Sequence, residues 1–306
     1  MSPKPETMRR IFTAAILLLV GLGATGCGSS PTTLPNRIPD TLRIATYNVH
    51  YIVLGKETGA WSVGDWERRK GPLNTAFGAL DADIVSFQEM ESFSRGSDGG
   101  VNLTLDWLLE KNPGYAAAAV GDWREFPSTQ PIFYRKSRLK LLQQGWYFFS
   151  DTPDIIYSPT YNGSYPAFAS WARFEDLESG NAFTVVNMHF EFKSFSNRTK
   201  SAALVAERTA PLIEAGEHVL LAGDLNAWHG MQPLETLEQI GLNFLPVRGT
   251  TYHMNHGINL MGAIDHIAHT EGLQAVGEPV VLRQKFDGEW PTDHYPVIAD
   301  FRFSIN

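Results

Sequence analysis

The chain has 306 residues, of which 43% are hydrophobic, and a formal net charge of −8. This length and apolar fraction suit one large α/β domain or two small ones with a substantial core. An acidic chain with no extended Lys/Arg run after residue 40 is a poor non-specific binder of nucleic acid, because phosphate neutralisation by Lys and Arg supplies most of that affinity. Acidic residues gathered in one cleft would instead suit a divalent cation.

The first 27 residues predict an exported lipoprotein. Lys4, Arg9 and Arg10 precede an apolar stretch that is too short for a comfortable membrane span and that ends in small residues at Cys27. The segment "ATGC" (24–27) resembles a bacterial lipobox, in which the cysteine is lipidated and becomes the mature N-terminus. We therefore expect residues 1–27 to be a lipoprotein signal peptide, the alternatives being an ordinary signal peptide or an uncleaved anchor.

The expected location is the bacterial cell envelope, with the protein anchored through a lipid on Cys27 in the outer membrane, facing the periplasm or the cell surface. Cys27 is the only cysteine of the chain, which excludes an internal disulfide and a Cys-based metal site. Residues 28–40, rich in Ser, Thr and Pro, predict a flexible tether. Residues 41–306 contain no low-complexity segment, repeat or second linker, so we expect one catalytic domain there.

Within this domain, apolar runs and alternating patterns predict more strands than helices. The predicted strands cover 42–49, 83–89, 131–135, 141–149, 167–174, 182–190, 217–225, 263–269 and 295–303. The predicted helices cover 65–82, with a break or restart at Gly71-Pro72; 102–112; 197–216, with a kink at Pro211; and 233–241. Because helices fall between some strands only, the pattern favours a two-sheet core with helices outside rather than one doubly wound sheet.

Residues that can bind metals or transfer protons end six β-like segments. They are Asn48, Glu89, Asn187 with His189, Asp224 with Asn226, Asp265 with His266, and Asp293 with His294. A turn explains any one of them: in "LLAGDLNAWHG" (220–230), Gly223 supplies backbone freedom, and Asp224 and Asn226 can bond their own backbone. Alternatively, Asp224 and Asn226, two residues apart in an extended chain, project to the same side and hold a water and a phosphate oxygen. The repetition over six segments favours a site.

In this order the motifs closely resemble those of the endonuclease/exonuclease/phosphatase superfamily, to which deoxyribonuclease I and neutral sphingomyelinases belong. The matching segments are Thr46-Tyr47-Asn48, Gln88-Glu89, Asn187-Met188-His189, Gly223-Asp224-Leu225-Asn226, Ile264-Asp265-His266-Ile267 and Thr292-Asp293-His294. Thr292 replaces the usual Ser and Met188 a common Thr, and neither change removes a proposed ligand. The resemblance spans essentially all of 41–306. It implies a four-layered α/β sandwich, in which two packed, mostly antiparallel β-sheets are flanked by helices.

The resemblance also implies a metal site and a metal-dependent phosphoric ester hydrolase. Glu89 resembles the principal metal ligand, with Asn48 and Asp293 nearby, and oxygen ligands of this kind suit Mg²⁺, with Mn²⁺ as a substitute. His189 and His294 resemble the pair that contacts the scissile phosphate.

Two further carboxylates complete the implied catalytic group. Asp265 resembles the carboxylate that orients His294. Asp224 is expected to orient or deprotonate the attacking water, and Asn226 to fix that carboxylate or a phosphate oxygen. Whether Asp224 or a histidine is the base, and whether one metal or two operate, stays open.

The expected substrate is a phosphodiester or phosphomonoester that is hydrolysed by direct attack of water. A secreted nuclease acting on DNA or RNA is the alternative, which the acidic charge disfavours, and a non-catalytic binding protein on the same fold is a second alternative. Candidate substrate-binding residues are Asn187, Asn255, His256 and Asn259. We expect a monomer that meets nucleic acid only as a substrate.

Overall fold

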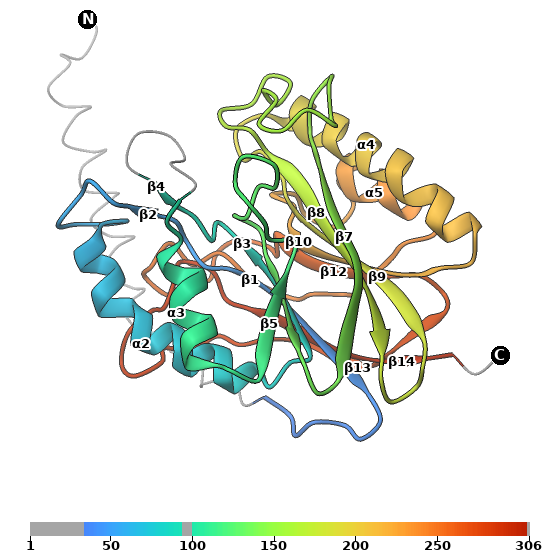
Figure 1. Cartoon of the computed structure of the whole chain (residues 1–306), viewed down its shortest axis with the longest axis horizontal. Coiled ribbons are helices and arrows are strands. Elements are labelled where there is room, and N and C mark those ends of the chain that lie inside the picture. Colours follow the sequence, from blue (N-terminus) through green and yellow to red (C-terminus); the bar gives the residue numbers. More distant parts are fainter. Residues whose placement is uncertain (1–33, 94–99, 305–306) are drawn as a thin grey trace, which may run out of the picture. The chain divides into compact units, whose positions relative to one another are not determined.

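The computed structural model describes residues 34–93 and 100–304 (Figure 1). The predicted signal peptide, Cys27 and the first part of the predicted tether lie outside the described residues. In the part that is described, no helix combines the length and the apolar character needed to cross a membrane.

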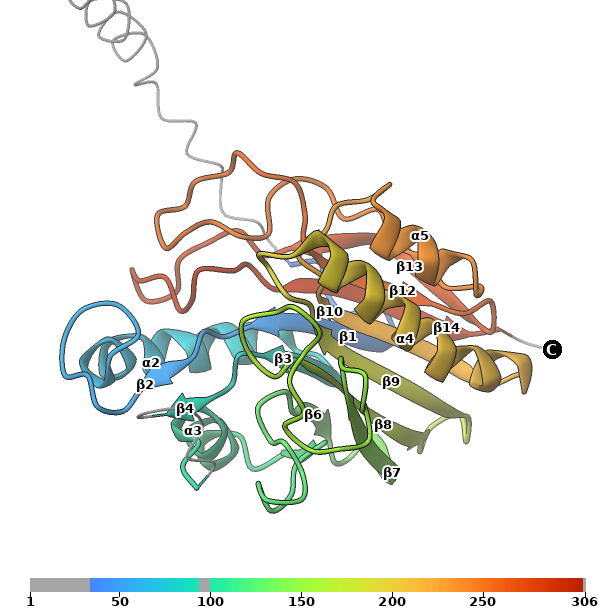
Figure 2. The ribbon, with the colours of Figure 1, turned by 90° about the horizontal axis from the view of Figure 1, so that it is seen from above.

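Two six-stranded mixed sheets form the centre of the fold (Figures 1 and 2). In order across the first sheet, the strands are β13 (Leu273–Val281), β14 (Val297–Phe303), β1 (Leu42–Asn48), β3 (Ile84–Gln88), β6 (Ile132–Arg135) and β5 (Tyr115–Ala118). Across the second sheet they are β11 (Asn243–Phe244), β12 (Asp265–His269), β10 (His218–Asp224), β9 (Ala182–His189), β8 (Phe168–Asp176) and β7 (Leu139–Phe148). The short strands β2 (Ile52–Val53) and β4 (Ser92–Phe93) pair with each other. Each large sheet contains one parallel pair, β1 with β3 and β9 with β10, so both are mostly antiparallel as predicted.

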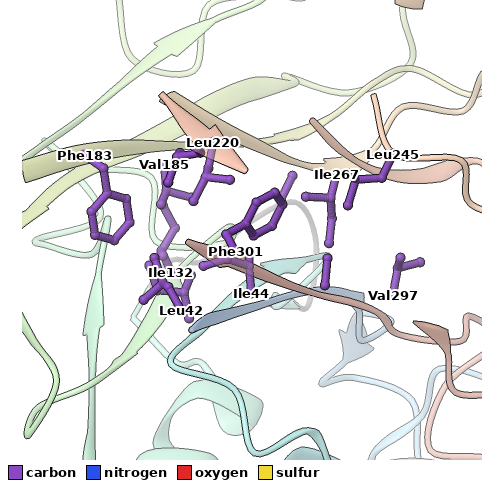
Figure 3. Close-up of a cluster of buried hydrophobic side chains, with 14 of the residues drawn as sticks. Leu42, Ile44, Ile132, Phe183, Val185, Leu220, Leu245, Ile267, Val297 and Phe301 are labelled. Atoms are coloured by element: carbon purple, nitrogen blue, oxygen red, sulfur yellow. The ribbon is translucent and has the colours of Figure 1, made fainter. Parts of the chain in front are cut away.

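The alternation of side chains along the central strands builds three apolar layers. Leu42 and Ile44 of β1 point into the layer between the sheets, where they meet Val185 of β9 and Leu220 of β10 (Figure 3). Their neighbours in sequence point outward to the helices, as Tyr47 does from β1. Central strands covered on both faces are rich in apolar residues, so the sequence predicts these segments as strands.

The helices cover the outer faces of the two sheets. α2 (Val63–Leu80) and α3 (Leu103–Lys111) pack on the first sheet, and α4 (Phe195–Glu214) and α5 (Gln232–Glu238) on the second (Figure 2). Three helices begin at a side-chain cap, where Ser62, Asn102 and Ser194 each accept a hydrogen bond from a first-turn backbone N–H. The result is the predicted four-layered sandwich.

Several local expectations were wrong. α2 runs unbroken through Gly71 and Pro72, because Pro72 and the residues that follow bury their apolar face against the sheet, and this packing outweighs the hydrogen bond that proline removes. α4 ends at Glu214 and contains Pro211, where the sequence predicts a kink. The sequence reading also omitted the short strands β2, β4, β5 and β11, and the edge strand β13.

The two parallel pairs bring four strand ends to one edge of the sandwich. Asn48 at the end of β1 lies beside Gln88, and Asp224 at the end of β10 lies between His189 and Asp265. Gly223 is required for this approach, since a Cβ there would lie 2.0 Å from the carbonyl oxygen of Met188 on β9.

Candidate active site

Asp224 lies at the centre of the polar cluster at this edge. Its Oδ2 is 3.7 Å from Nε2 of His189 and 3.7 Å from Nε2 of His294, and it accepts a hydrogen bond from Nδ2 of Asn48 at 3.2 Å. The residue is 2% exposed. Two imidazoles from different segments therefore face one buried carboxylate.

The second carboxylate of the cluster binds the far side of one imidazole. Oδ2 of Asp265 lies 2.9 Å from Nδ1 of His294, and both groups are buried. This contact fixes which imidazole nitrogen faces Asp224. Nδ1 binds Asp265, so Nε2 points to Asp224. It is the acid–imidazole contact that the family resemblance implies.

Glu89 and Asp293 lie on the more open side of the cluster, and the buried Asn48 contacts Glu89. Nδ2 of Asn48 donates to Oε1 of Glu89 at 3.1 Å, and the same oxygen is 3.8 Å from Nε2 of His189. The Thr292 hydroxyl lies 2.9 Å from the main-chain carbonyl oxygen of Asn48 and 3.3 Å from Oδ1 of Asp293, and these two acceptors share its single proton. The Thr292 hydroxyl thus connects the segment carrying Asp293 to the end of β1.

Asn226 contributes through its backbone as well as its side chain. Its N–H donates to Oδ1 of Asp224 at 2.9 Å, and its Nδ2 donates to the carbonyl of Phe190 at 2.9 Å. The expectation of an extended chain from Asp224 to Asn226 was wrong, because β10 ends at Asp224 and Asn226 is left-handed with φ +47°. Glu89 is also left-handed, with φ +54°. Non-glycine residues hold such conformations where the surrounding structure fixes them, often at functional sites.

Together, burial and neighbouring charges raise the pKa values of both central groups. Burial, followed by the charge of Asp265, raises the pKa of Asp224 to about 6, against the opposing effect of His294 and His189. Burial by itself lowers the pKa of His294, but the carboxylates of Asp265, Asp224 and Asp293 outweigh it and raise this pKa to about 10. At neutral pH the cluster can therefore present a protonated imidazole beside a carboxylate that accepts protons readily.

The donor set fits a hard divalent cation. Glu89 and Asp293 supply carboxylate oxygens that keep some exposure, with side chains 23% and 15% exposed. Among the described residues, no Lys or Arg forms an ion pair with Glu89 or Asp293, so no Lys or Arg salt bridge occupies their carboxylate oxygens. Carboxylates left in this state are suited to Mg²⁺ or Mn²⁺.

A second group of possible ligands is more deeply buried. Asp224, Asp265 and His294 offer ligand atoms that all lie within 4.8 Å of one another. Because Asp265 and His294 already bond to each other, this trio is better described as an acid–imidazole–acid row. A cation has better access to the side of Glu89 and Asp293.

The four candidate substrate-binding residues do not join the cluster. Asn187 is fully buried, where its amide donates to the carbonyl of Phe87 at 2.8 Å and accepts from Nε2 of Gln88 at 2.7 Å, so it ties β9 to β3. Asn255, His256 and Asn259 are exposed in the loop 252–262. Within the described residues, no hydrogen bond or ion pair joins these three side chains to Glu89, Asp224 or Asp293.

Sequence reasoning missed three residues that contact the site. Nε2 of His50 lies 3.7 Å from Oδ2 of Asp293, and the hydroxyl of Tyr165 lies 3.5 Å from Nε2 of His189. Arg69 of α2 donates to main-chain carbonyls on both sides of the site. His50 stands two residues after Asn48 and could have been suspected, whereas Arg69 lies in a charged run that is typical of a solvated helix face.

Comparison with solved structures supports the fold. The chain is similar to mannosyl-6-phosphatase of Bacteroides thetaiotaomicron, with 24% identity, a TM-score of 0.72, and coverage of 86% of this chain and 100% of the other. It is similar to the catalytic domain of human Nocturnin with bound sulfate, with 17% identity, a TM-score of 0.62, and coverage of 90% and 100%. It is also similar to D. rerio TDP2 with a single-strand DNA product, with 16% identity, a TM-score of 0.60, and coverage of 86% and 99%.

A match to a family model identifies the family to which the chain belongs. No curated protein matches the chain significantly. The model of the Endonuclease/Exonuclease/phosphatase family matches residues 45–294, which include every segment that contributes to the polar cluster. The chain therefore belongs to the Endonuclease/Exonuclease/phosphatase family, whose members are hydrolases such as phosphatases and nucleases.

Proposed function

We propose that this protein is a divalent-metal-dependent phosphoesterase that hydrolyses a phosphodiester or phosphomonoester by direct attack of water. The observation that carries the proposal is the position of Asp224, whose Oδ2 faces the Nε2 atoms of His189 and His294 at 3.7 Å each. Phosphoryl transfer needs a group that orients water and groups that stabilise charge on the phosphate oxygens. This cluster supplies both kinds at one edge of the sandwich.

Each residue has a role that its surroundings support. Asp224, with its pKa raised to about 6, holds the attacking water and can accept its proton. The backbone N–H of Asn226 keeps the Asp224 carboxylate in place. His294, kept protonated by Asp265, would donate to a phosphate oxygen, and His189, which also faces Asp224, would be the second imidazole to contact the phosphate.

Glu89, Asn48 and Asp293 would hold the cation, for which Mg²⁺ is proposed and Mn²⁺ is the expected substitute. When bound, such a cation neutralises charge on the phosphate oxygens and on the leaving group. The exposure of Glu89 and Asp293 leaves room for waters that complete the shell of Mg²⁺.

The test is hydrolysis of a phosphoester panel that contains bis(4-nitrophenyl) phosphate, single- and double-stranded DNA, RNA, sphingomyelin, inositol phosphates and sugar phosphates. We expect activity with Mg²⁺ or Mn²⁺ that EDTA abolishes. Glu89→Gln keeps the shape but removes a charge, so it should raise the Mg²⁺ concentration needed for half-maximal rate about tenfold or more. Glu175→Gln, which changes only an exposed pair with Lys140, is the matched control and should behave as wild type. Full activity in EDTA would refute metal dependence.

The same panel separates the substrate classes. The net charge of −8 gives little support to binding of a long polyanion, so we propose a small or lipid-borne phosphoester rather than nucleic acid. The solved relatives include a mannosyl-6-phosphatase and a protein bound to a DNA product, so both classes belong on the panel. Preferential cleavage of DNA or RNA would favour the nuclease instead.

We also propose export and lipid anchoring of a monomer through Cys27, on the evidence of the apolar stretch that ends at "ATGC". Cys27→Ser should abolish incorporation of radiolabelled palmitate and release the protein from the membrane fraction. A soluble wild-type protein that retains residues 1–26 would contradict this proposal.

A further inference from the structure

His50 is a buried histidine beside Asp293. The residue is 4% exposed, and its Nε2 lies 3.7 Å from Oδ2 of Asp293. Its ring is nearly parallel to those of Tyr51 and Trp61, with centroids 5.3 and 5.4 Å away and interplanar angles of 7° and 3°. These parallel rings favour one plane for the imidazole, in which its Nε2 edge faces Asp293.

Neither ring nitrogen of His50 has a hydrogen-bond partner among the described residues. Buried polar groups are normally paired, because an unpaired one forfeits its bonds to water without replacement. Oδ2 of Asp293 lies only slightly beyond hydrogen-bond distance from Nε2, and Oδ1 of Asp293 already accepts from Thr292 at 3.3 Å. A small displacement would give Oδ2 of Asp293 a donor of its own, whereas Oδ1 shares the Thr292 proton with the carbonyl of Asn48.

The backbone of His50 is held from α2. His50 is left-handed with φ +65°, and Arg69 donates to its carbonyl at 2.9 Å and to that of Val49 at 2.8 Å. The same guanidinium donates to the carbonyl of Pro291 at 3.2 Å, two residues before Asp293. One buried side chain therefore fixes the separation of the two segments that carry His50 and Asp293.

From these contacts we infer that His50 is a positioning residue for Asp293: its Nε2–H holds Oδ2 of Asp293 in place for the divalent cation. The inference rests on the proposed function, in which Asp293 is a metal ligand. Loss of a hydrogen-bond partner behind a metal ligand weakens metal affinity about 10–100-fold. His50 would thus set the affinity for the cation without touching it.

The test is calorimetric titration of Mg²⁺ and of Mn²⁺ into the full chain without substrate. His50→Asn suits the left-handed backbone, but its amide cannot reach the position of Nε2. His50→Gln can place an N–H there. We expect Asn to raise the Kd for both ions about tenfold or more, and Gln to stay within about threefold of wild type.

His218→Gln is the matched control, because His218 begins β10 at the opposite end from Asp224 and should leave both Kd values unchanged. Melting temperatures in EDTA establish that each variant is folded. Wild-type affinity in His50→Asn would overturn the inference, and so would a Gln variant as weak as the Asn variant, since packing would then explain the loss. A loss confined to Mn²⁺ would also overturn it, by making His50 a direct ligand. A wild-type chain that binds neither ion would instead refute the proposed metal dependence.

Discussion

Replacing Asp265 by Asn tests the acid–imidazole pair. The two groups are 2.9 Å apart and buried, and Asp265 is the foremost of the groups that keep His294 protonated against burial. Asp265→Asn keeps the shape and removes the charge. A hydrogen bond to a charged group contributes about 2–3 kcal/mol, and about 1.4 kcal/mol corresponds to a tenfold change in rate, so kcat should fall about a hundredfold.

The variant should also shift the pH dependence of the rate. Without Asp265, burial is opposed by fewer carboxylates, so the pKa of His294 falls. If protonated His294 stabilises the phosphate, the alkaline limb of the kcat profile moves to lower pH. Steady-state hydrolysis of bis(4-nitrophenyl) phosphate in saturating Mg²⁺, between about pH 5 and about pH 10, measures both effects.

Asp176→Asn is the matched control. Asp176 is as buried as Asp265 and bonds Arg138 at 2.6 and 3.1 Å, but it ends β8, whose other end lies near the site. This substitution should lower the melting temperature and leave kcat unchanged. The reasoning fails if Asp265→Asn keeps more than about a third of wild-type kcat at every pH with an unmoved alkaline limb.

Two further predictions concern stability. Arg69→Met leaves three main-chain carbonyls without their donor, so it should lower the free energy of unfolding by about 3 kcal/mol or more in urea titrations. Arg68→Met changes a half-exposed neighbour and should lower it by less than about 1 kcal/mol. Equal effects of the two substitutions would contradict the role assigned to Arg69. Burial lowers the pKa of His253 and of His266 to about 4, below the value of about 6.5 in the unfolded chain. As the pH falls below about 6.5, the unfolded chain therefore binds protons before the folded one does. The free energy of unfolding should decrease as the pH falls from about 6.5 toward about 4. Unfolding free energies that stay flat across this window would refute that expectation.

The strands that carry the site could be predicted to within about two residues because they combine apolar runs with alternating patterns, as buried strands do. β13 was missed for a physical reason. It contains Gly277 and Pro279, and its pairing with β14 is irregular between Val276 and Val280, so its side chains do not keep a regular alternation. β5, "YAAA", is too short and too uniform to show a period.

Motifs at strand ends predict the metal and catalytic residues, and the two parallel pairs of the fold bring those ends together. The supporting residues could not be predicted in this way. Arg68 and Arg69 are adjacent and chemically identical, yet Arg69 is buried against the site while the Arg68 side chain is 50% exposed. Helical spacing places Arg69 on the buried face of α2 with Trp66 and Leu73, so the inward direction can be read from the sequence. The carbonyls that Arg69 binds belong to other segments, so its role cannot be read in the same way.

The rate of Asp224→Asn tests the central claim most directly. The substitution is isosteric, and its effect should appear in the transition state, where the attacking water gains charge. On bis(4-nitrophenyl) phosphate with saturating Mg²⁺, we predict a fall in kcat of about a hundredfold or more with KM within a few-fold of wild type. A folded Asp224→Asn protein that keeps more than about a tenth of wild-type kcat would contradict the account.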